Sequence, residues 1–191
     1  MSEKIQAMIF SIGYGDRSVG QTLDLLQRQG VKFLIDVRSS PYSKHHPDYN
    51  LETLERHCAD CRIKYVFMGD LLGGRPQSGK CYDDQGRVNY TALEQEPYFK
   101  KGIERLKSAA KQGIEVALIC SERRPEQCHR SKLIGRVLAG EDIPIKHIDF
   151  DGKLIDQEEV INRILAGQSE LFGVPPEVTR SRGVYRKDQN D

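Results

Sequence analysis

The alternation of short apolar runs with amphipathic helical patterns constrains the fold of this chain most strongly. Strand-like runs lie at residues 7–12, 32–37, 63–68, 114–120, 145–150 and 153–155. Helical patterns lie between or after them, at residues 18–30, 51–58, 98–112, 131–138 and 157–166. This order predicts an α/β domain with a mainly parallel sheet. Asp151-Gly152, between the last two runs, predicts an antiparallel hairpin at the sheet edge near the C-terminus.

Length and composition predict one globular domain. A chain of 191 residues suits one core, and we expect the domain to span residues 1–174. The Pro-containing polar stretch 175–191 predicts a flexible tail. The Gly-rich, polar segment 73–89 is long for an internal connection, which makes it a candidate lid or binding loop.

The charge and cysteine content exclude several function classes. A net charge of +1 gives no global field toward nucleic acid or acidic lipid, so anion binding must be local. No apolar run approaches the roughly 18–20 residues of a membrane span, and the N-terminal residues lack a signal-peptide core, so no membrane partner is expected. Five cysteines, an odd number without framework spacing, favour reduced thiols in the cytoplasm.

Polar residues gather in the loops that follow the predicted strands, where parallel sheets bind ligands. The first loop offers close backbone approach and a helix N-terminus to an anion, through Gly13, Tyr14, Gly15 and Arg17. The second loop combines charged, hydroxyl and aromatic groups: Asp36, Arg38, Ser39 and Tyr42. Asp36 could act as an acid or base, or could pair internally with Arg38 or Arg17.

The third loop contains Gly73, Gly74 and Arg75, which could close over a substrate or form a flexible connection. The fourth loop follows the strand-like run 114–120 and has the sequence CSERRPEQCHR at 120–130. It supplies Cys120 as a possible nucleophile, Glu122 and His129 as acid/base candidates, and Arg130 as an anion ligand.

The chemistry of the fourth loop has three interpretations. A thiolate at Cys120 is plausible, because a helix N-terminus and arginines lower a thiol pKa. A metal could bind Cys120, Cys128 and His129, although adjacent Cys and His are poor zinc spacing and no fourth ligand is evident. The third interpretation is structural, with buried cysteines and a Glu122–Arg130 pair.

Four motifs together resemble a known family: SIGYGDRS at 11–18, LIDVRSSPYSK at 34–44, LLGGR at 71–75 and the CSERRPEQCHR stretch. The chain is similar to members of the family called domain of unknown function 488 over most of residues 8–150. The resemblance implies a three-layer, Rossmann-like α/β domain and supplies no reaction, cofactor or oligomeric state. A fainter likeness to rhodanese-like and low-molecular-weight phosphatase domains departs at Glu126 and at Pro125, which removes an amide donor.

These features lead to three functional hypotheses. The first is an enzyme, or an enzyme-like site, for a small anionic or nucleotide-type substrate at the carboxyl ends of the strands. The second is a nucleic-acid-binding module for a single strand or a flipped base, linked to repair or processing, because tyrosines alternate with Arg and Lys in the loops. The third is a thiol-based sensor or partner-binding domain.

Overall fold

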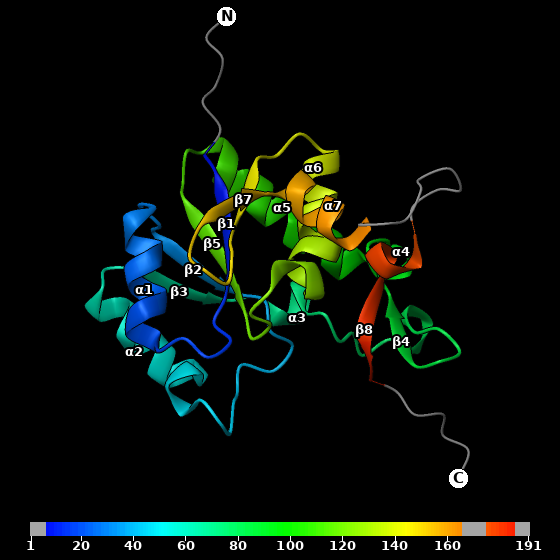
Figure 1. The fold of residues 1–191 in the computed structure, drawn as a ribbon, viewed down its shortest axis with the longest axis horizontal. Helices are drawn as coiled ribbons and strands as arrows, with labels where there is room; N and C mark the ends of the chain where they lie inside the picture. Colours follow the sequence, from blue (N-terminus) through cyan, green and yellow to red (C-terminus); the bar gives the residue numbers. More distant parts are fainter. Residues whose placement is uncertain (1–6, 166–174, 186–191) are drawn as a thin grey trace, which may run out of the picture.

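A computed structural model describes residues 7–165 and 175–185 of the chain, and Figure 1 shows its three-layer α/β fold. The central six-stranded sheet has the order β3-β2-β5-β1-β6-β7. Five strands run parallel: β1 (Ile9–Gly13), β2 (Phe33–Asp36), β3 (Lys64–Phe67), β5 (Val116–Cys120) and β6 (Ile145–Ile148). The edge strand β7 (Leu154–Asp156) is antiparallel to β6, which confirms the predicted hairpin.

Helices cover both faces of the sheet. On one side lie α1 (Val19–Arg28) and α2 (Leu51–Asp60), and on the other lie α5 (Pro97–Lys111), α6 (Arg136–Gly140) and α7 (Gln157–Leu165). A π-helical segment, Arg130–Gly135, leads into α6, and the short α3 (Gly69–Leu72) and α4 (Tyr90–Leu93) precede α5. Single 3-10 turns occupy Pro47–Tyr49, Gly79–Cys81 and Pro125–Gln127.

The alternation of side chains along β5 decides which groups face which helix layer. Ala117 and Ile119 belong to the core beneath α1 and α2. Val116, Leu118 and Cys120 belong to the opposite core, beneath α5 and α6. Successive residues of a strand point to opposite faces, so Cys120 faces the layer that also carries the π-helical segment.

The start of α1 follows directly from its sequence. The Ser18 side chain accepts a hydrogen bond from the Gln21 backbone, and the Gln21 side chain accepts one from the Ser18 backbone. This capping box confirms the predicted helix start. It fixes where the first loop ends and the helix begins.

The C-terminal segment differs from the expected flexible tail over residues 175–185. Here α8 (Pro176–Thr179) is followed by β8 (Arg180–Val184), which pairs antiparallel with β4 (Arg87–Asn89) in a second, two-stranded sheet. Val178 and Ser181 are buried, and the Val88 amide donates a hydrogen bond to the Ser181 hydroxyl at 2.9 Å. Residues 186–191 lie outside the described part of the chain, and the single-domain assignment stays a prediction.

Within residues 7–165 and 175–185, no helix combines the length and apolar character that crossing a membrane requires.

Candidate functional site

The four loops predicted to carry the site meet in one cavity at the carboxyl edge of the sheet. The cavity has a volume of about 360 Å³, and we call it the loop pocket. The predicted residues that line it are Tyr14, Arg38, Ser39, Tyr42, Gly74, Arg75, Cys120, Glu122 and His129, together with Cys128 from the metal alternative. Its volume falls in the range of small-molecule sites.

Two thiols and an imidazole form a compact group in the pocket wall, which we call the sulfur–imidazole cluster: Cys120, Cys128 and His129. His129 Nδ1 lies 3.6 Å from Cys128 Sγ and 3.9 Å from Cys120 Sγ. All three residues are buried. His129 Nε2 lies 3.0 Å from the Val37 carbonyl oxygen, and a carbonyl only accepts. In the neutral imidazole the proton is therefore on Nε2, and the Nδ1 lone pair faces both sulfurs.

Arg130 supplies positive charge beneath the cluster. It is fully buried, and its Nε donates to Cys128 Sγ at 3.3 Å. Its other nitrogens donate to the Ser11 hydroxyl at 3.1 Å and the Glu122 carbonyl oxygen at 2.7 Å. A buried cation needs a compensating anion, and among these partners only the thiol can ionise.

The two thiols have opposite pKa shifts. Burial alone would raise the pKa of Cys128, but the hydrogen bond from Cys120 and the charge of Arg130 outweigh it and lower the pKa to about 6. The hydrogen bond to Cys128, followed by burial, raises the pKa of Cys120 to about 12. The structure therefore favours Cys128 as the thiolate, which differs from the expectation for Cys120.

Asp36 is committed to an internal pair instead of the pocket. Its carboxylate accepts hydrogen bonds from Arg38 Nε at 2.9 Å and Nη2 at 2.5 Å, and from the Tyr65 hydroxyl at 2.7 Å. Arg38 Nη2 also donates to the Tyr49 carbonyl oxygen at 2.7 Å. Asp36 is fully buried and does not line the loop pocket, so this geometry supports the internal pair rather than an acid/base role.

Arg17 also lies away from the pocket lining. Its guanidinium donates to the Gly13 carbonyl oxygen at 2.6 Å and to the Asp149 carbonyl oxygen. Arg17 therefore ties the first loop to the segment after β6. Arg130, discussed above, does not line the pocket, and its guanidinium donates hydrogen bonds to two residues that do, Cys128 and Glu122. The geometry thus gives both arginines structural contacts, and neither lines the loop pocket.

Glycines allow the loops to approach one another. A Cβ atom at Gly13 would lie 1.8 Å from the Glu122 carbonyl oxygen, and one at Gly74 would lie 2.8 Å from the His129 ring. A Cβ atom at Gly73 would lie 2.5 Å from the Ser39 hydroxyl oxygen. Gly15 has a φ of +54°, and a Cβ atom there would lie 2.6 Å from the Arg123 side chain. Gly13, Gly15 and Gly73 shape the loops without lining the pocket.

The rim of the pocket includes residues that sequence reasoning missed. The Arg75 guanidinium lies 4.2 Å from the centre of the Tyr185 ring, and Arg182 donates a hydrogen bond to Gln127 at 2.8 Å. Tyr90 also lines the pocket. Tyr185 and Arg182 belong to the segment expected to be a tail, and no apolar alternation in RSRGVY marks it as a strand that returns to the site.

Aromatic rings also line the pocket. Tyr14 stacks on Tyr49 with ring centres 3.9 Å apart, and the Arg38 guanidinium carbon lies 5.5 Å from the centre of the Tyr14 ring. Tyr42 projects into solvent with 67% of its surface exposed. The pocket therefore has aromatic surfaces beside its basic rim.

Comparison with known proteins agrees with the motifs. No curated protein matches the chain. The family model described as Domain of unknown function DUF488 matches residues 18–137, which is more than half of the 191 residues and includes the second, third and fourth loops. The chain belongs to the DUF488 family.

Proposed function

We propose that the chain is an enzyme that binds a small anionic substrate in the loop pocket. The observation that carries the proposal is the convergence of basic, aromatic and sulfur-containing side chains from four separate loops on one cavity. Such groups are costly to gather beside a core unless they perform work there, and titratable groups with shifted pKa values cluster at functional sites.

The basic rim supports an anionic ligand. Arg75 and Arg182 are exposed on the pocket rim, and Glu122 is the single carboxylate among its lining residues. One guanidinium nitrogen of Arg38, Nη1, is buried without a hydrogen-bond partner in the described part of the chain. Guanidinium groups bind phosphate and carboxylate in a bidentate manner, so a ligand carrying either group fits this rim.

The aromatic walls favour a ligand that also has a planar part. Tyr14, Tyr42, Tyr90 and Tyr185 line the same cavity as the arginines. Tyrosine rings stack on planar groups, and their hydroxyls supply polar contacts. A nucleotide-type substrate combines a planar base with a phosphate, which matches both features.

Glu122 is the acid/base candidate for the reaction. It lines the pocket, and no described side chain forms a hydrogen bond or ion pair with its carboxylate. A carboxylate without a fixed partner can exchange a proton with a bound substrate.

We also propose a cytoplasmic location, because the five cysteines are unpaired.

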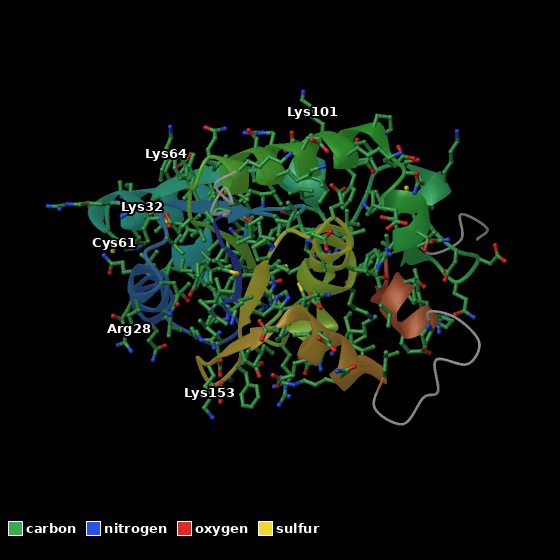
Figure 2. The ribbon with its side chains drawn as sticks, turned by 90° about the horizontal axis from the view of Figure 1, so that it is seen from above. Arg28, Lys32, Cys61, Lys64, Lys101 and Lys153 are labelled. Atoms are coloured by element: carbon green, nitrogen blue, oxygen red, sulfur yellow. The ribbon has the colours of Figure 1, made fainter. Side chains whose placement is uncertain are left out.

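Calorimetric titration with AMP, inorganic phosphate and adenosine tests the binding part of the proposal. We expect AMP to bind, adenosine to bind at least about tenfold more weakly, and Arg75→Gln to weaken AMP by about tenfold. Arg28→Gln is the matched control, because Arg28 lies at the outer surface and pairs with Asp24 (Figure 2). Equal affinity of the Arg75 and Arg28 variants, or no binding of either anion, would contradict the proposal.

Turnover can be tested separately from binding. The protein is incubated with a panel of nucleotides and phosphate esters, and products are detected by mass spectrometry. Glu122→Gln should suppress turnover of any substrate found while leaving its affinity within a few-fold of that of the unmodified protein. Unchanged turnover in this variant would remove Glu122 from the reaction.

A nucleic-acid-binding module is the second candidate, favoured by the exposed ring of Tyr42 beside the arginines of the rim. Base stacking on such a ring is sequence-tolerant, and phosphate contacts make the affinity salt-dependent. Salt-dependent binding of a single-stranded oligonucleotide, weakened by Tyr42→Ala and Arg75→Gln, would favour this candidate over a small substrate.

A further inference from the structure

We propose that Cys120, Cys128 and His129 form a three-ligand site for a thiophilic divalent metal ion of the zinc class. The fourth coordination position would face the loop pocket. The proposed function concerns the rim of this pocket, whereas the metal site concerns the cluster in its wall. The two can therefore succeed or fail independently.

The distances within the cluster fit tetrahedral coordination. Zn–S bonds of about 2.3 Å and Zn–N bonds of about 2.0–2.1 Å place sulfur and nitrogen ligands about 3.6 Å apart. In the structure, His129 Nδ1 lies 3.6 Å from one sulfur and 3.9 Å from the other. All ligand atoms lie within 4.8 Å of one another, and no other such group of His, Cys, Asp or Glu occurs in residues 7–165 and 175–185.

The adjacent Cys128 and His129 can share an ion because the chain turns between them. A 3-10 turn, Pro125–Gln127, precedes Cys128, and the π-helical segment begins at Arg130. The two side chains are therefore not held in one regular helical repeat. Their 3.6 Å separation answers the objection that consecutive Cys and His make a poor zinc pair.

The surroundings orient the ligands as outer partners do in metal sites. The hydrogen bond to the Val37 carbonyl oxygen directs Nδ1 of His129 toward the sulfurs. Gly74 leaves room for the imidazole ring, and Arg130 donates to the Cys128 sulfur. Metal-bound histidines almost always donate their other ring N–H to a carbonyl or carboxylate, and such partners tune the site.

Burial favours ligands over a freely attacking nucleophile. Both cysteines belong to the pocket lining, but Cys128 is only 1% exposed and Cys120 only 5% exposed, so little of either side chain is open to a substrate in the pocket. A metal ion held by both sulfurs would instead present its own open position to the cavity. Zinc sites with three protein ligands keep the fourth position for water or substrate, and a Cys₂His set is one known form.

Cobalt(II) spectroscopy on the full-length, chelator-treated protein tests the site. We expect one equivalent of Co²⁺ to give the visible bands of tetrahedral cobalt and a thiolate-to-cobalt charge-transfer band, both removed by one equivalent of Zn²⁺. Cys128→Ser and His129→Gln should each weaken Co²⁺ binding by more than about 100-fold. Cys61→Ser is the matched thiol control and should leave binding unchanged, since Cys61 is half-buried just after α2 (Figure 2) and does not line the loop pocket.

Two further measurements test the metal site even if the Cys128 and His129 variants do not fold. Gly74→Ala keeps every ligand and crowds the His129 ring, so it should weaken Co²⁺ binding by about tenfold. Gly140→Ala, where an added Cβ meets no atom, should not. X-ray absorption of the zinc-loaded protein should give two sulfur ligands at about 2.3 Å and nitrogen or oxygen ligands at about 2.0–2.1 Å.

The outcomes separate the two proposals. Absence of stoichiometric Co²⁺ binding, or binding lost in Cys61→Ser but kept in Cys128→Ser, would overturn the metal site. Arg75→Gln should lose AMP affinity and keep Co²⁺ affinity. Metal binding without any anion binding would contradict the proposed function alone.

Discussion

At the scale of single residues, the Asp36–Arg38 pair determines how the second loop is held. Arg38 is 5% exposed and Asp36 is fully buried, so each charge has lost most of its hydration. Three hydrogen bonds from the Arg38 side chain, one from the Arg38 backbone amide and one from Tyr65 compensate the carboxylate. Removing one partner of a buried pair leaves an uncompensated charge, which destabilises far more than the pair itself stabilises.

Asp36→Asn should therefore lower the free energy of unfolding by about 3–5 kcal/mol. Tyr65→Phe removes one hydrogen bond to the same carboxylate and should cost about 1.5–3 kcal/mol, which makes it the graded control. Urea denaturation measures both. A stability of Asp36→Asn within about 1 kcal/mol of the unmodified protein would contradict a structural role for the pair.

His147 should make stability depend on pH. Its ring nitrogens lie 2.6 Å from the Ser11 hydroxyl and 2.6 Å from Gln157 Oε1. Burial, aided by the charge of Arg130, lowers the pKa of His147 to about 4. The unfolded chain, with a histidine pKa of about 6.5, binds the proton more readily, so the stability supplied by neutral His147 is lost as pH falls from about 6.5 to 4.

The expected loss is roughly 3 kcal/mol, measured as the change in free energy of unfolding across this pH range. His147→Gln should flatten that part of the profile, whereas His45→Gln, at an exposed position, should leave it unchanged. A profile of His147→Gln identical to that of the unmodified protein would show that another group is responsible.

At the scale of secondary-structure elements, β8 completes the rim by pairing with β4. The Tyr185 amide donates to the Gly86 carbonyl oxygen at 2.8 Å, which brings its ring beneath Arg75. The rim thus joins the third loop to a strand about a hundred positions further along the chain. Loss of β8 would expose β4 on its paired edge.

A chain ending at residue 174 should keep the six-stranded sheet, because none of its strands pairs with β8. Hydrogen exchange at the Val88 amide should rise by at least about tenfold, since its acceptor, Ser181, is removed. Ser181→Ala in the full chain is the control that keeps β8 and removes only the two bonds of this hydroxyl, from the Val88 amide and to the Gly183 carbonyl oxygen. Unchanged protection at Val88 in the shortened chain would contradict the pairing of β4 with β8.

The sequence predicted the main sheet because its strands are continuous apolar runs, such as Val116–Cys120, and its helices have clear stripes. It did not predict β8, because Arg180–Val184 has one buried residue in five and depends on a distant partner for its conformation. The loops of the site were also predictable, since three of them directly follow apolar strands and the third loop comes after β3 and the short α3.

The distribution of charge within the site could not be predicted from the order of residues. The sequence favoured Cys120 as the thiolate, whereas the hydrogen bond from Cys120 and the charge of Arg130 favour Cys128 in the structure. Asp36 similarly looks like an acid/base group until Arg38 and Tyr65 are seen to occupy its oxygens. Both distinctions depend on side-chain geometry across different elements.

At the scale of the whole molecule, near-zero net charge means that anion attraction must be local, so we compare the loop pocket with a second cavity that contains arginines. The second is a more open cavity lined by Arg17, Arg28 and Arg123 with Asp16, Asp24 and Asp151. Its basic groups are matched by carboxylates, as in the Arg28–Asp24 and Arg123–Asp16 pairs. The loop pocket has a single carboxylate, Glu122, beside its arginines.

Amide chemical-shift mapping during titration with inorganic phosphate compares these cavities directly. We expect the largest shifts at the backbone amides that border the loop pocket: Tyr14, Ser39, Gly74 and Ser121. Arg75→Gln should reduce them at equal phosphate concentration. Shifts centred on Asp16, Arg28 and Gly152, or no saturable shifts at all, would contradict the assignment of the loop pocket as the functional site.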